Sequence, residues 1–395
     1  MILKDLRSAL RSNIREYGMY IALLVIMGIF TIATEGVFIS SRNIANLLNQ
    51  TGYIAVLAIG ITLVIVIRHI DLSIGFLSGF LGAIAAIAMT SWGFPAWASI
   101  LAVMVLGTLA GLVTGYLVAG VGIPAFVASL AGWLIYRGAL LMVTLKTGTI
   151  IIPDDWFNAI GNGYIPDVFP SETAFLPDVH KLTLLLGLAA IVWFNIRSAG
   201  ERASRRRYGF DVLPADMFAL KQVFLSVVLA LITWVVAGYN GMSWTLAIVI
   251  VVALIYNFVT TRTVLGRHIY AVGGNPEAAE LSGVSVKKIT LTVFGSMGML
   301  CGLSGVLFAS RLQSATTTAG TLFELDAIAA AYIGGVSAAG GVGKVTGSIV
   351  GAIVYMSLTS GMNLLGTDIS LQYIIRGAVL VAAVVFDVQT RKAKS

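Results

Sequence analysis

Residues 97–118 read WASILAVMVLGTLAGLVTGYLV, a run without a single charged side chain. A helix needs roughly 20 apolar residues to cross the hydrocarbon of a bilayer, so this run predicts a transmembrane helix. Further runs that qualify, or nearly so, are 17–34, 51–67, 74–92, 124–144, 182–196, 218–238, 243–260, 288–310, 344–364 and 369–387. The stretch 326–343 is apolar but rich in glycine, and we expect it either to span or to form a broken, partly re-entrant segment.

The composition indicates that lipid is the solvent for much of the chain. Of its 395 residues, 58% are hydrophobic and 11% are charged, whereas soluble domains carry about 25% charged residues. We therefore predict an all-α fold, a polytopic transmembrane bundle of about 10–12 membrane segments within a single domain spanning 1–395. Broken or re-entrant helices are expected near 68–75 and 326–343, where charge or glycine interrupts the apolar pattern.

The net charge of +7 has two interpretations, nucleic-acid binding and membrane topology. We favour the second and expect no nucleic-acid partner, because Lys and Arg fall between the apolar runs and such residues mark cytoplasmic loops. The N-terminal residues 1–16 are basic and lack a small-residue cleavage site before a run long enough to span. This pattern predicts a retained first helix rather than a cleaved signal peptide.

The distribution of loop charges predicts the topology. Basic segments are expected to be cytoplasmic: the N-terminus 1–16 with Lys4, Arg7, Arg11 and Arg15, the loop 197–216, the loop 261–287, and the tail with Arg391, Lys392 and Lys394. The loop 147–180 is expected to face the periplasm because it is acidic, with Asp154, Asp155, Asp167, Glu172 and Asp178. If 326–343 counts as one crossing, the number of crossings between these loops agrees with the side predicted for each loop. The chain then crosses the membrane twelve times and has both termini in the cytoplasm. Ten crossings with re-entrant pieces is the alternative.

Glycines recur at a spacing of four within several apolar runs. Small residues at this spacing allow helix backbones to approach closely in lipid. We therefore interpret these glycines as helix contacts rather than ligand-binding residues; they are Gly75 and Gly79, Gly107, Gly111 and Gly115, and Gly347 and Gly351.

The first informative motif is RHIDLSIG at 68–75, which interrupts the apolar stretch 51–92. Charged groups at membrane depth are costly and are commonly functional. Asp71 and Ser73 are suitable helix N-caps, so the motif predicts a chain break followed by a new helix that contains Gly75. An ordinary capped cytoplasmic turn is the competing interpretation.

The second motif is GGNPEAAELSG at 273–283, which is typical of a short capped helix. Asn275 suits the N-cap, Pro276 the first helical position, and Gly283 the left-handed residue that ends a helix. A helix of about seven residues is unstable alone in water. We therefore expect this one to dock on a partner, although a capped loop without a partner remains the alternative.

The third motif is FELDAIAA at 323–330, followed by IGGVSAAGGVG at 333–343. The glycines permit close approach of backbone or solute. The stretch is not a phosphate-binding loop, because Ala338 stands where the first glycine should be and Val345 follows Lys344 where Ser or Thr is required. We find no other Walker-type loop, so an ATPase driving transport would be a separate chain.

No catalytic or metal-binding constellation is evident. His69, His180 and His268 lie in separate segments, and the chain has neither an H-E-x-x-H nor a G-x-S-x-G motif. The only cysteine, Cys301, lies within an apolar run and is expected to be a small buried thiol. We predict no catalytic residues, no metal and no cofactor bound by this chain.

At these three motifs the chain resembles the permeases of ABC importers for ribose, galactose, xylose and related sugars. The matching stretches are 70–75, 273–283 and 324–343. Two further segments are similar, SRNI at 41–44 and PAF at 124–126. The resemblance as a whole covers residues 41–387. The stretch 181–240 resembles an extra helix pair of the xylose and multiple-monosaccharide types that ribose-type permeases lack. The Arg68–His69 pair is more similar to the multiple-monosaccharide group.

The resemblance implies a permease of the bacterial inner membrane that forms a homodimer and binds a cytoplasmic ABC ATPase, which would hold ATP and Mg²⁺, and a periplasmic sugar-binding protein. It implies that 261–287 is a cytoplasmic coupling loop with ATPase-coupling residues Asn275, Pro276, Glu277, Ala278, Ala279, Leu281, Ser282 and Gly283. Residues of the translocation path, or of a structural motif, would be Asp71, Ser73, Gly75, Glu324, Asp326, Gly334, Gly335, Ser337, Gly340 and Gly341.

Two other classes compete with this interpretation. An ion-coupled secondary transporter would need buried acidic side chains as ion sites, and Asp71 and Asp326 are the candidates. A membrane enzyme would need a catalytic constellation, which the sequence lacks. If the importer interpretation holds, each aspartate is expected to cap a helix or meet an arginine, so that no isolated charge remains at membrane depth.

Overall fold

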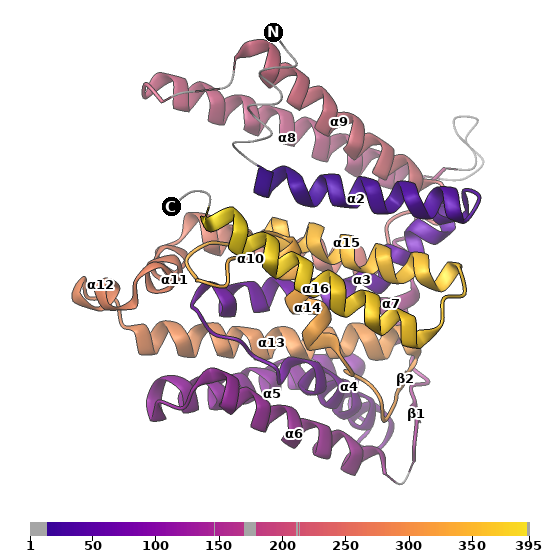
Figure 1. The fold of residues 1–395 in the computed structure, drawn as a ribbon. Helices are drawn as coiled ribbons and strands as arrows, with labels where there is room; N and C mark the ends of the chain where they lie inside the picture. Colours follow the sequence, from indigo (N-terminus) through magenta and orange to yellow (C-terminus); the bar gives the residue numbers. More distant parts are fainter. Residues whose placement is uncertain (1–13, 146, 170–178, 211, 213, 393–395) are drawn as a thin grey trace. The chain divides into compact units, whose positions relative to one another are not determined.

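The computed structural model describes residues 14–145, 147–169, 179–210, 212 and 214–392 (Figure 1). Several charged residues that were used above to predict the topology lie outside these ranges; they are Lys4, Arg7, Arg11, Glu172, Asp178 and Lys394.

The described chain is almost entirely helical (Figure 1). Its α-helices are α2 (Ile14–Ala33), α3 (Ser41–Val66), α4 (Ile74–Thr90), α5 (Ala96–Tyr116), α6 (Ala125–Thr144), α7 (Asp155–Asn162), α8 (Lys181–Arg207), α9 (Ala215–Ala237), α10 (Trp244–Arg262), α11 (Val264–Gly274), α12 (Pro276–Leu281), α13 (Val286–Leu312), α14 (Phe323–Ile333), α15 (Val345–Leu364) and α16 (Ile369–Lys392). A 3-10 turn, η1 (Val37–Ile39), and a π-helical turn, η2 (Leu117–Val121), follow α2 and α5. Strands β1 (Ile150–Ile151) and β2 (Ser314–Ala315) pair antiparallel, with Ile150 opposite Ala315.

The apolar runs predicted from the sequence coincide with helices. Among the described residues, nine helices are long and apolar enough to cross a membrane. Two shorter apolar helices, Gly18–Ala33 and Ile74–Thr90, account for the two remaining runs. The predicted fold class, an all-α polytopic membrane bundle, is therefore confirmed.

Two segments differ from a simple alternation of spanning helices and loops. The stretch 326–343 does not form one spanning helix, because α14 has 11 residues and ends at Ile333. That length corresponds to about 16 Å, half of the hydrocarbon thickness. The basic segment expected as a loop from 197 begins within α8, which continues to Arg207. Arginine is a good helix former, and cations are favoured in the last turn of a helix.

The chain divides into two compact units. The first, here called the main unit, comprises Met1–Phe38, Leu47–Gly163 and Thr245–Ser395. The second, here called the hairpin unit, comprises Ile39–Asn46 and Tyr164–Trp244 and contains α8 and α9. The expectation of one transmembrane domain spanning 1–395 stays a prediction.

The core of the main unit is built around α13, which packs against α4 and α5. A β-carbon on Gly298 of α13 would clash with the backbone carbonyl of Gly107 on α5, and one on Gly111 would clash with the carbonyl of Phe294. A β-carbon on Gly351 of α15 would likewise clash with the carbonyl of Ala330 on α14. The interpretation of these glycines as close helix contacts is confirmed for α5 and α15.

The two ends of α13 mark the two ends of the main unit (Figure 1). The helix has 27 residues and is therefore about 40 Å long. α11 and α12 contact α13 at the end where its first residues lie. At the opposite end, the Asn162 side chain of α7 donates to the carbonyl of Ser310, 2.8 Å away. We refer to these as the α12 end and the β1–β2 end.

Two stretches of the main unit are broken, each consisting of a non-helical segment followed by a short helix. Residues 67–73 precede α4, and residues 316–322 precede α14. The Gly341 amide, in the loop after α14, donates to the carbonyl of Val66 at the end of α3, 2.8 Å away. The beginning of α14 is buried in the unit, since Phe323 and Glu324 are 8% and 4% exposed.

In the hairpin unit, α8 and α9 are joined by an amide network. The Asn195 side chain of α8 donates to the Ser226 hydroxyl at 2.8 Å and accepts from Gln222 at 3.1 Å. At the start of α8, Asp167 accepts backbone hydrogen bonds from Lys181 and Leu182 at 2.7 and 3.1 Å. Slight desolvation acts to raise the pKa of Asp167, but these backbone N–H donors outweigh it and hold the pKa below its ordinary value.

Candidate functional site

The first motif forms an aspartate-centred turn ahead of α4. Asp71 is 3% exposed, and its Oδ1 accepts from the Ser73 amide at 2.9 Å and from the Ser73 hydroxyl at 2.6 Å. Ser73 occupies the N-cap position of α4 but makes no side-chain cap hydrogen bond. The expectation that Ser73 caps the helix with its own side chain is therefore wrong, because its hydroxyl is committed to Asp71. The predicted chain break followed by a new helix is confirmed.

The beginnings of α4 and α14 meet inside the main unit. A β-carbon on Gly75 would clash with Oε2 of Glu324, in the first turn of α14, and would lie 2.6 Å from the carbonyl of Gly320. Oε1 of Glu324 accepts from the Trp133 indole of α6 at 3.0 Å. Glu324 is 4% exposed, and its Oε2 has no hydrogen-bond partner among the described residues. The first turns of α4 and α14 thus meet at one buried carboxyl group.

An aromatic and cationic layer adjoins this junction. The Phe76 ring packs edge-on against Trp133, with ring centroids 4.8 Å apart. The Arg137 guanidinium lies 4.9 Å from the centroid of Phe76 and donates to the carbonyl of Thr317 at 2.5 Å. Trp133 and Arg137 thus join α6 to both broken stretches. Neither Trp133 nor Arg137 was predicted from the sequence, because no short-range pattern connects them with Gly75 or Glu324.

Asp326 has partners within the core, as expected for a structural carboxylate. It is 8% exposed, and its Oδ1 lies 3.8 Å from Nη1 of Arg376 on α16. The Tyr355 hydroxyl of α15 also hydrogen-bonds the Asp326 side chain. The predicted arginine partner is confirmed for Asp326. The prediction that Asp71 caps a helix or meets an arginine is wrong, because Ser73 holds the N-cap position of α4 and Asp71 is stabilised by the turn it makes with Ser73.

The glycine cluster of the third motif forms the loop between α14 and α15. Gly334 packs against the backbone of Gly347, and Gly335, Gly340 and Gly341 all have positive φ angles, which glycine adopts without strain. Within this loop, the Ser337 amide donates to the carbonyl of Val342 at 2.9 Å, and its hydroxyl accepts from the Ala339 amide at 3.3 Å.

Arg68 connects the first motif with the second and third. Its Nε donates to the carbonyl of Gly273 at 2.7 Å, and its Nη2 donates to the carbonyl of Gly274. These carbonyls end α11, where the helix dipole favours a cation. A β-carbon on Gly340 would clash with the Arg68 side chain, so the glycine loop packs on the same arginine. Arg68 adopts a positive φ of 65°, which is uncommon for a residue with a side chain.

The second motif has the geometry predicted for it. α12 contains six residues, with Pro276 at its first position. The Asn275 side chain accepts from the Ala278 amide at 3.1 Å, and Gly283 follows the helix with a φ of +84°. Ser282 closes the helix through its backbone amide, which donates to the carbonyl of Ala278.

α12 presents an unpartnered apolar side chain. Leu281 is 91% exposed, whereas Ala279 on the same short helix is 5% exposed and faces the main unit. Glu277 and Glu280 are also exposed. Leu281 is therefore the apolar side chain that α12 leaves open to its surroundings.

The predicted site residues therefore form two groups. Near the α12 end, the second motif meets the glycine loop through Arg68. At the beginning of α14, about 14 Å along the helix from its end at Ile333, Gly75 and Glu324 meet beside Trp133. Among the described residues, no group of three or more His, Cys, Asp or Glu side chains is arranged to hold a metal ion.

Comparisons with known proteins relate the chain to transport systems. The family model described as "Branched-chain amino acid transport system / permease component" matches residues 43–384. The xylose transport system permease protein of Haemophilus influenzae is 38% identical over 96% of this chain and 98% of its own length. The corresponding Escherichia coli protein is 37% identical over 98% of this chain and 95% of its length. The ribose import permease protein of Escherichia coli is 33% identical over 94% of this chain and 93% of its own length. No solved structure matches the chain significantly.

Proposed function

Because the chain belongs to the family of branched-chain amino acid transport system permease components, we propose that it is the membrane-spanning permease subunit of an ATP-driven importer for a monosaccharide. The relatives named for xylose and ribose transport support a sugar rather than an amino acid as the substrate. An ion-coupled secondary transporter is not favoured, because the family and the named relatives are permease components of transport systems. The two candidate aspartates, Asp71 and Asp326, are also held by partners within the fold.

The family implies that ATP is hydrolysed by a separate ATPase subunit and that a periplasmic binding protein delivers the sugar. In this proposal, α12 is the coupling helix, residues 261–287 form the cytoplasmic coupling loop, and the permease works as a homodimer in the bacterial inner membrane. The exposed Leu281 supports this assignment, because it supplies apolar surface for a groove on the ATPase.

The observation that carries the proposal is the contact of Arg68 with the carbonyls of Gly273 and Gly274. These carbonyls directly precede α12, and Arg68 directly precedes the segment that leads to Asp71 and α4. A displacement of α12 by the ATPase would therefore pull on the start of a broken stretch whose helix begins beside Glu324. Gly75, Glu324 and the glycine loop are the elements of the pathway that this motion would rearrange.

The coupling role is tested with Arg68→Ala in the importer reconstituted with its ATPase and binding-protein subunits. A hydrogen bond from a charged donor contributes roughly 1.5 kcal/mol, and less where solvent reaches it. Losing both hydrogen bonds of Arg68 is therefore expected to lower sugar uptake about tenfold while ATP hydrolysis continues. Arg68→Lys should recover part of the uptake, since it keeps the charge. Arg267→Ala, which changes an exposed arginine of α11, is the matched control.

Changes within α12 sharpen the same test. Glu277→Ala and Gly283→Val are expected to uncouple ATP hydrolysis from uptake, and Gly283→Val should also strain the helix end, where φ is +84°. Undiminished uptake by a complex that carries both changes would exclude α12 as the coupling element.

The energy source and substrate are tested by uptake of labelled xylose. Uptake is expected to persist when an ionophore collapses the proton gradient at constant ATP, and to be reduced by unlabelled xylose or ribose but not by leucine. Uptake that stops with the ionophore would indicate a secondary transporter. Competition by leucine alone would indicate an amino-acid importer.

The proposed orientation places 197–216 in the cytoplasm and 147–180 in the periplasm, with both termini cytoplasmic, in keeping with the arginine cluster. Single cysteines at Ser204 and Asn162, in a Cys301→Ala background, report this orientation. In intact spheroplasts, an impermeant maleimide is expected to label the Asn162 position and not the Ser204 position. The reverse pattern would invert the topology.

A further inference from the structure

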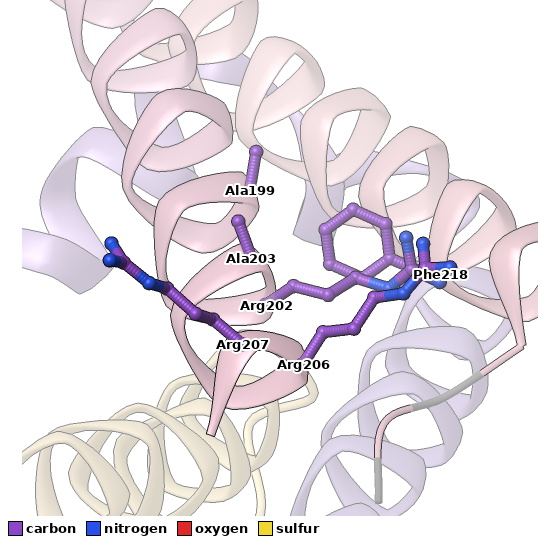
Figure 2. Close-up of a pocket in the computed structure, with 6 residues that line it drawn as sticks. All are labelled: Ala199, Arg202, Ala203, Arg206, Arg207 and Phe218. Carbon is purple, nitrogen blue, oxygen red and sulfur yellow. The ribbon is translucent and has the colours of Figure 1, made fainter. Parts of the chain in front are cut away.

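A cavity between α8 and α9 in the hairpin unit is lined in part by Arg202, Arg206 and Phe218 (Figure 2). Its Arg202 stacks on the Phe218 ring, 4.8 Å from the centroid, and makes further interactions within the chain. That cavity therefore offers no free cation on Arg202 for a ligand. A second cavity, of about 350 Å³ and here called the loop cavity, lies in the main unit and has a different lining.

The loop cavity lies at the α12 end, beside the loop between α14 and α15. Its walls come from α2 through Met19 and Tyr20, from α11 through Tyr270, and from the loop and the start of α15. No acidic residue lines it, and the only cation of its lining, Lys344, already interacts within the chain. The volume is at the small end of the range for ligand sites, which suits a small uncharged solute.

Main-chain groups make up much of the lining of the loop cavity. Five of its eleven lining residues are glycines, so a solute can approach the backbone without meeting a side chain. The Thr346 side chain adds a hydroxyl group that makes no hydrogen bond to the described residues. A sugar hydroxyl both donates and accepts hydrogen bonds, and main-chain groups and hydroxyls satisfy both roles. Such a lining favours a neutral, hydroxyl-rich ligand.

Tyr270 supplies an aromatic residue at a fixed position in the wall. Its hydroxyl donates to the carbonyl of Gly343 at 2.6 Å, which ties α11 to the loop. A sugar ring carries apolar C–H faces besides its hydroxyls, and an aromatic side chain covers such a face with its own apolar body. An aromatic surface with a few polar groups beside it is the usual composition of a small-molecule site.

The loop cavity adjoins the elements that the proposed coupling motion displaces. The Gly341 amide, in its wall, donates to the carbonyl of Val66 at 2.8 Å, and a β-carbon on Gly341 would lie 2.9 Å from Cα of Gly274, at the end of α11. Gly334 packs against Gly347 at the beginning of α15. A ligand in the cavity would contact α11, the loop and α15 together, and it would therefore stabilise this arrangement against any in which they separate.

From this geometry we propose that the loop cavity binds the transported monosaccharide from the cytoplasmic side and thereby slows further import. This role rests on the proposed function, which places the α12 end in the cytoplasm and a sugar in the pathway. Sugar that has accumulated in the cytoplasm occupies the cavity, holds the loop against α11 and opposes the displacement of α12 by the ATPase. Because the site offers no free charge, binding is expected only at about millimolar sugar, so that import slows when the sugar is plentiful.

The test uses the whole importer in proteoliposomes, with the ATPase subunit outside and the binding protein and labelled xylose enclosed. Unlabelled xylose added outside, on the cytoplasmic face, is expected to slow ATP-driven transport of the label. Thr346→Val removes the hydroxyl and keeps the shape, so the half-inhibitory concentration is expected to rise about fivefold, the effect of one hydrogen bond. Thr292→Val, at an exposed threonine of α13 outside the cavity, is the matched control and is expected to change that concentration less than about twofold.

A second pair of variants tests the cavity by its volume. Met19→Trp fills the cavity from α2 and is expected to abolish the inhibition by external xylose. Met27→Trp lies on the same helix but outside the cavity, and it is expected to retain the inhibition. Both variants are expected to keep the transport rate that is measured without external xylose.

Each outcome either supports or overturns the regulatory site. Transport that external xylose does not slow, or inhibition unchanged by Thr346→Val and Met19→Trp, would overturn it. Inhibition by inorganic phosphate but not by xylose, lost in Met19→Trp, would assign the cavity to an anion and likewise overturn it. If the importer moves no xylose at all, the proposed function fails instead, and the cavity is tested by saturation-transfer NMR of xylose with the purified chain. Binding that is lost in Met19→Trp and kept in Met27→Trp then supports the site, and equal signals overturn it.

Discussion

Two pairs of helices are similarly apolar but differ in how far the rest of the chain buries them. One pair is α3 and α13 of the main unit, and the other is α8 and α9 of the hairpin unit. Within the chain, 89% and 67% of the apolar stretches of α3 and α13 are buried, against 6% and 11% for α8 and α9. Hydropathy therefore indicates which segments enter the membrane but not which of them face protein. The two pairs of helices have to be distinguished by the groups through which they pack.

The two regions are held together by different interactions. In the main unit, several glycines pack backbone against backbone, as where Gly298 packs against Gly107, while others such as Gly60 and Gly361 face side chains. In the hairpin unit, long side chains meet through the Asn195 network, and the glycine contact is with a side chain, since Gly187 faces that of Thr233. Backbone contacts cannot yield to an added atom, whereas a threonine side chain can change its rotamer. We therefore expect the main unit to be far more sensitive to substitution.

The largest effect is expected at Asp326 in the main unit. Asp326→Leu removes the carboxylate that pairs with Arg376, whose side chain is 21% exposed, and that hydrogen-bonds Tyr355. Because Arg376 is only partly buried, the loss is expected near the lower end of the about 3–5 kcal/mol that breaking a buried pair typically costs. The variant is expected to lose most of its folded protein or its uptake. Asp326→Asn keeps a polar partner for Tyr355 and is expected to retain substantial uptake. Both variants are assessed by the yield of monodisperse protein and by sugar uptake in the reconstituted importer.

Asp71 provides a second position for this test. Asp71→Asn can still accept from the Ser73 amide and is expected to keep most uptake, whereas Asp71→Leu cannot. If both Asn variants abolished uptake while remaining folded, the two charges would be functional and the structural interpretation would be wrong.

The sequence predicted what is local and missed what is distant. The capped helix at 275–283 was predictable because its signals lie within a few residues of one another, as in the hydrogen bond from the Ala278 amide to Asn275. The apolar runs were predictable from length alone. The junction of Gly75 with Glu324 was not, because it joins residues 249 positions apart (324 − 75) and leaves no periodic signal.

The extent of α8 was missed for a different reason. The charged segment 197–207 reads as a loop if charge is taken to end a transmembrane helix. Charged residues mark where a helix leaves the hydrocarbon, but they do not end the helix. Arginine is a good helix former, so the helical backbone can continue beyond the membrane. The structure shows this, since α8 continues to Arg207 without interruption.

An intermediate effect is expected from one added methyl group at the α5–α13 contact. Gly298→Ala places a β-carbon against the carbonyl of Gly107, and overpacking of this kind costs typically about 1–3 kcal/mol. Gly138→Ala is the matched control, because its β-carbon would meet nothing within 4 Å and alanine is the better helix former. The midpoint of thermal unfolding, followed by size-exclusion chromatography, is expected to fall for Gly298→Ala and to hold or rise for Gly138→Ala. Equal midpoints would remove the distinction between backbone and side-chain packing.

The smallest effect is expected in the hairpin unit, although Asn195 makes several hydrogen bonds there. Asn195→Leu removes the bonds to Ser226 and Gln222, but side-chain hydrogen bonds between transmembrane helices average only about 0.6 kcal/mol. Their loss is partly offset because leucine is itself compatible with lipid. We expect a small decrease in the thermal midpoint and unchanged uptake.

A double-mutant cycle of Asn195→Ala with Ser226→Ala isolates the direct hydrogen bond between these two side chains. The control Asn257→Ala changes an asparagine of α10 in the main unit. A coupling energy as large as the loss at Asp326 would mean that the hairpin is held as firmly as the core, and the contrast between the two regions would then rest on exposure alone.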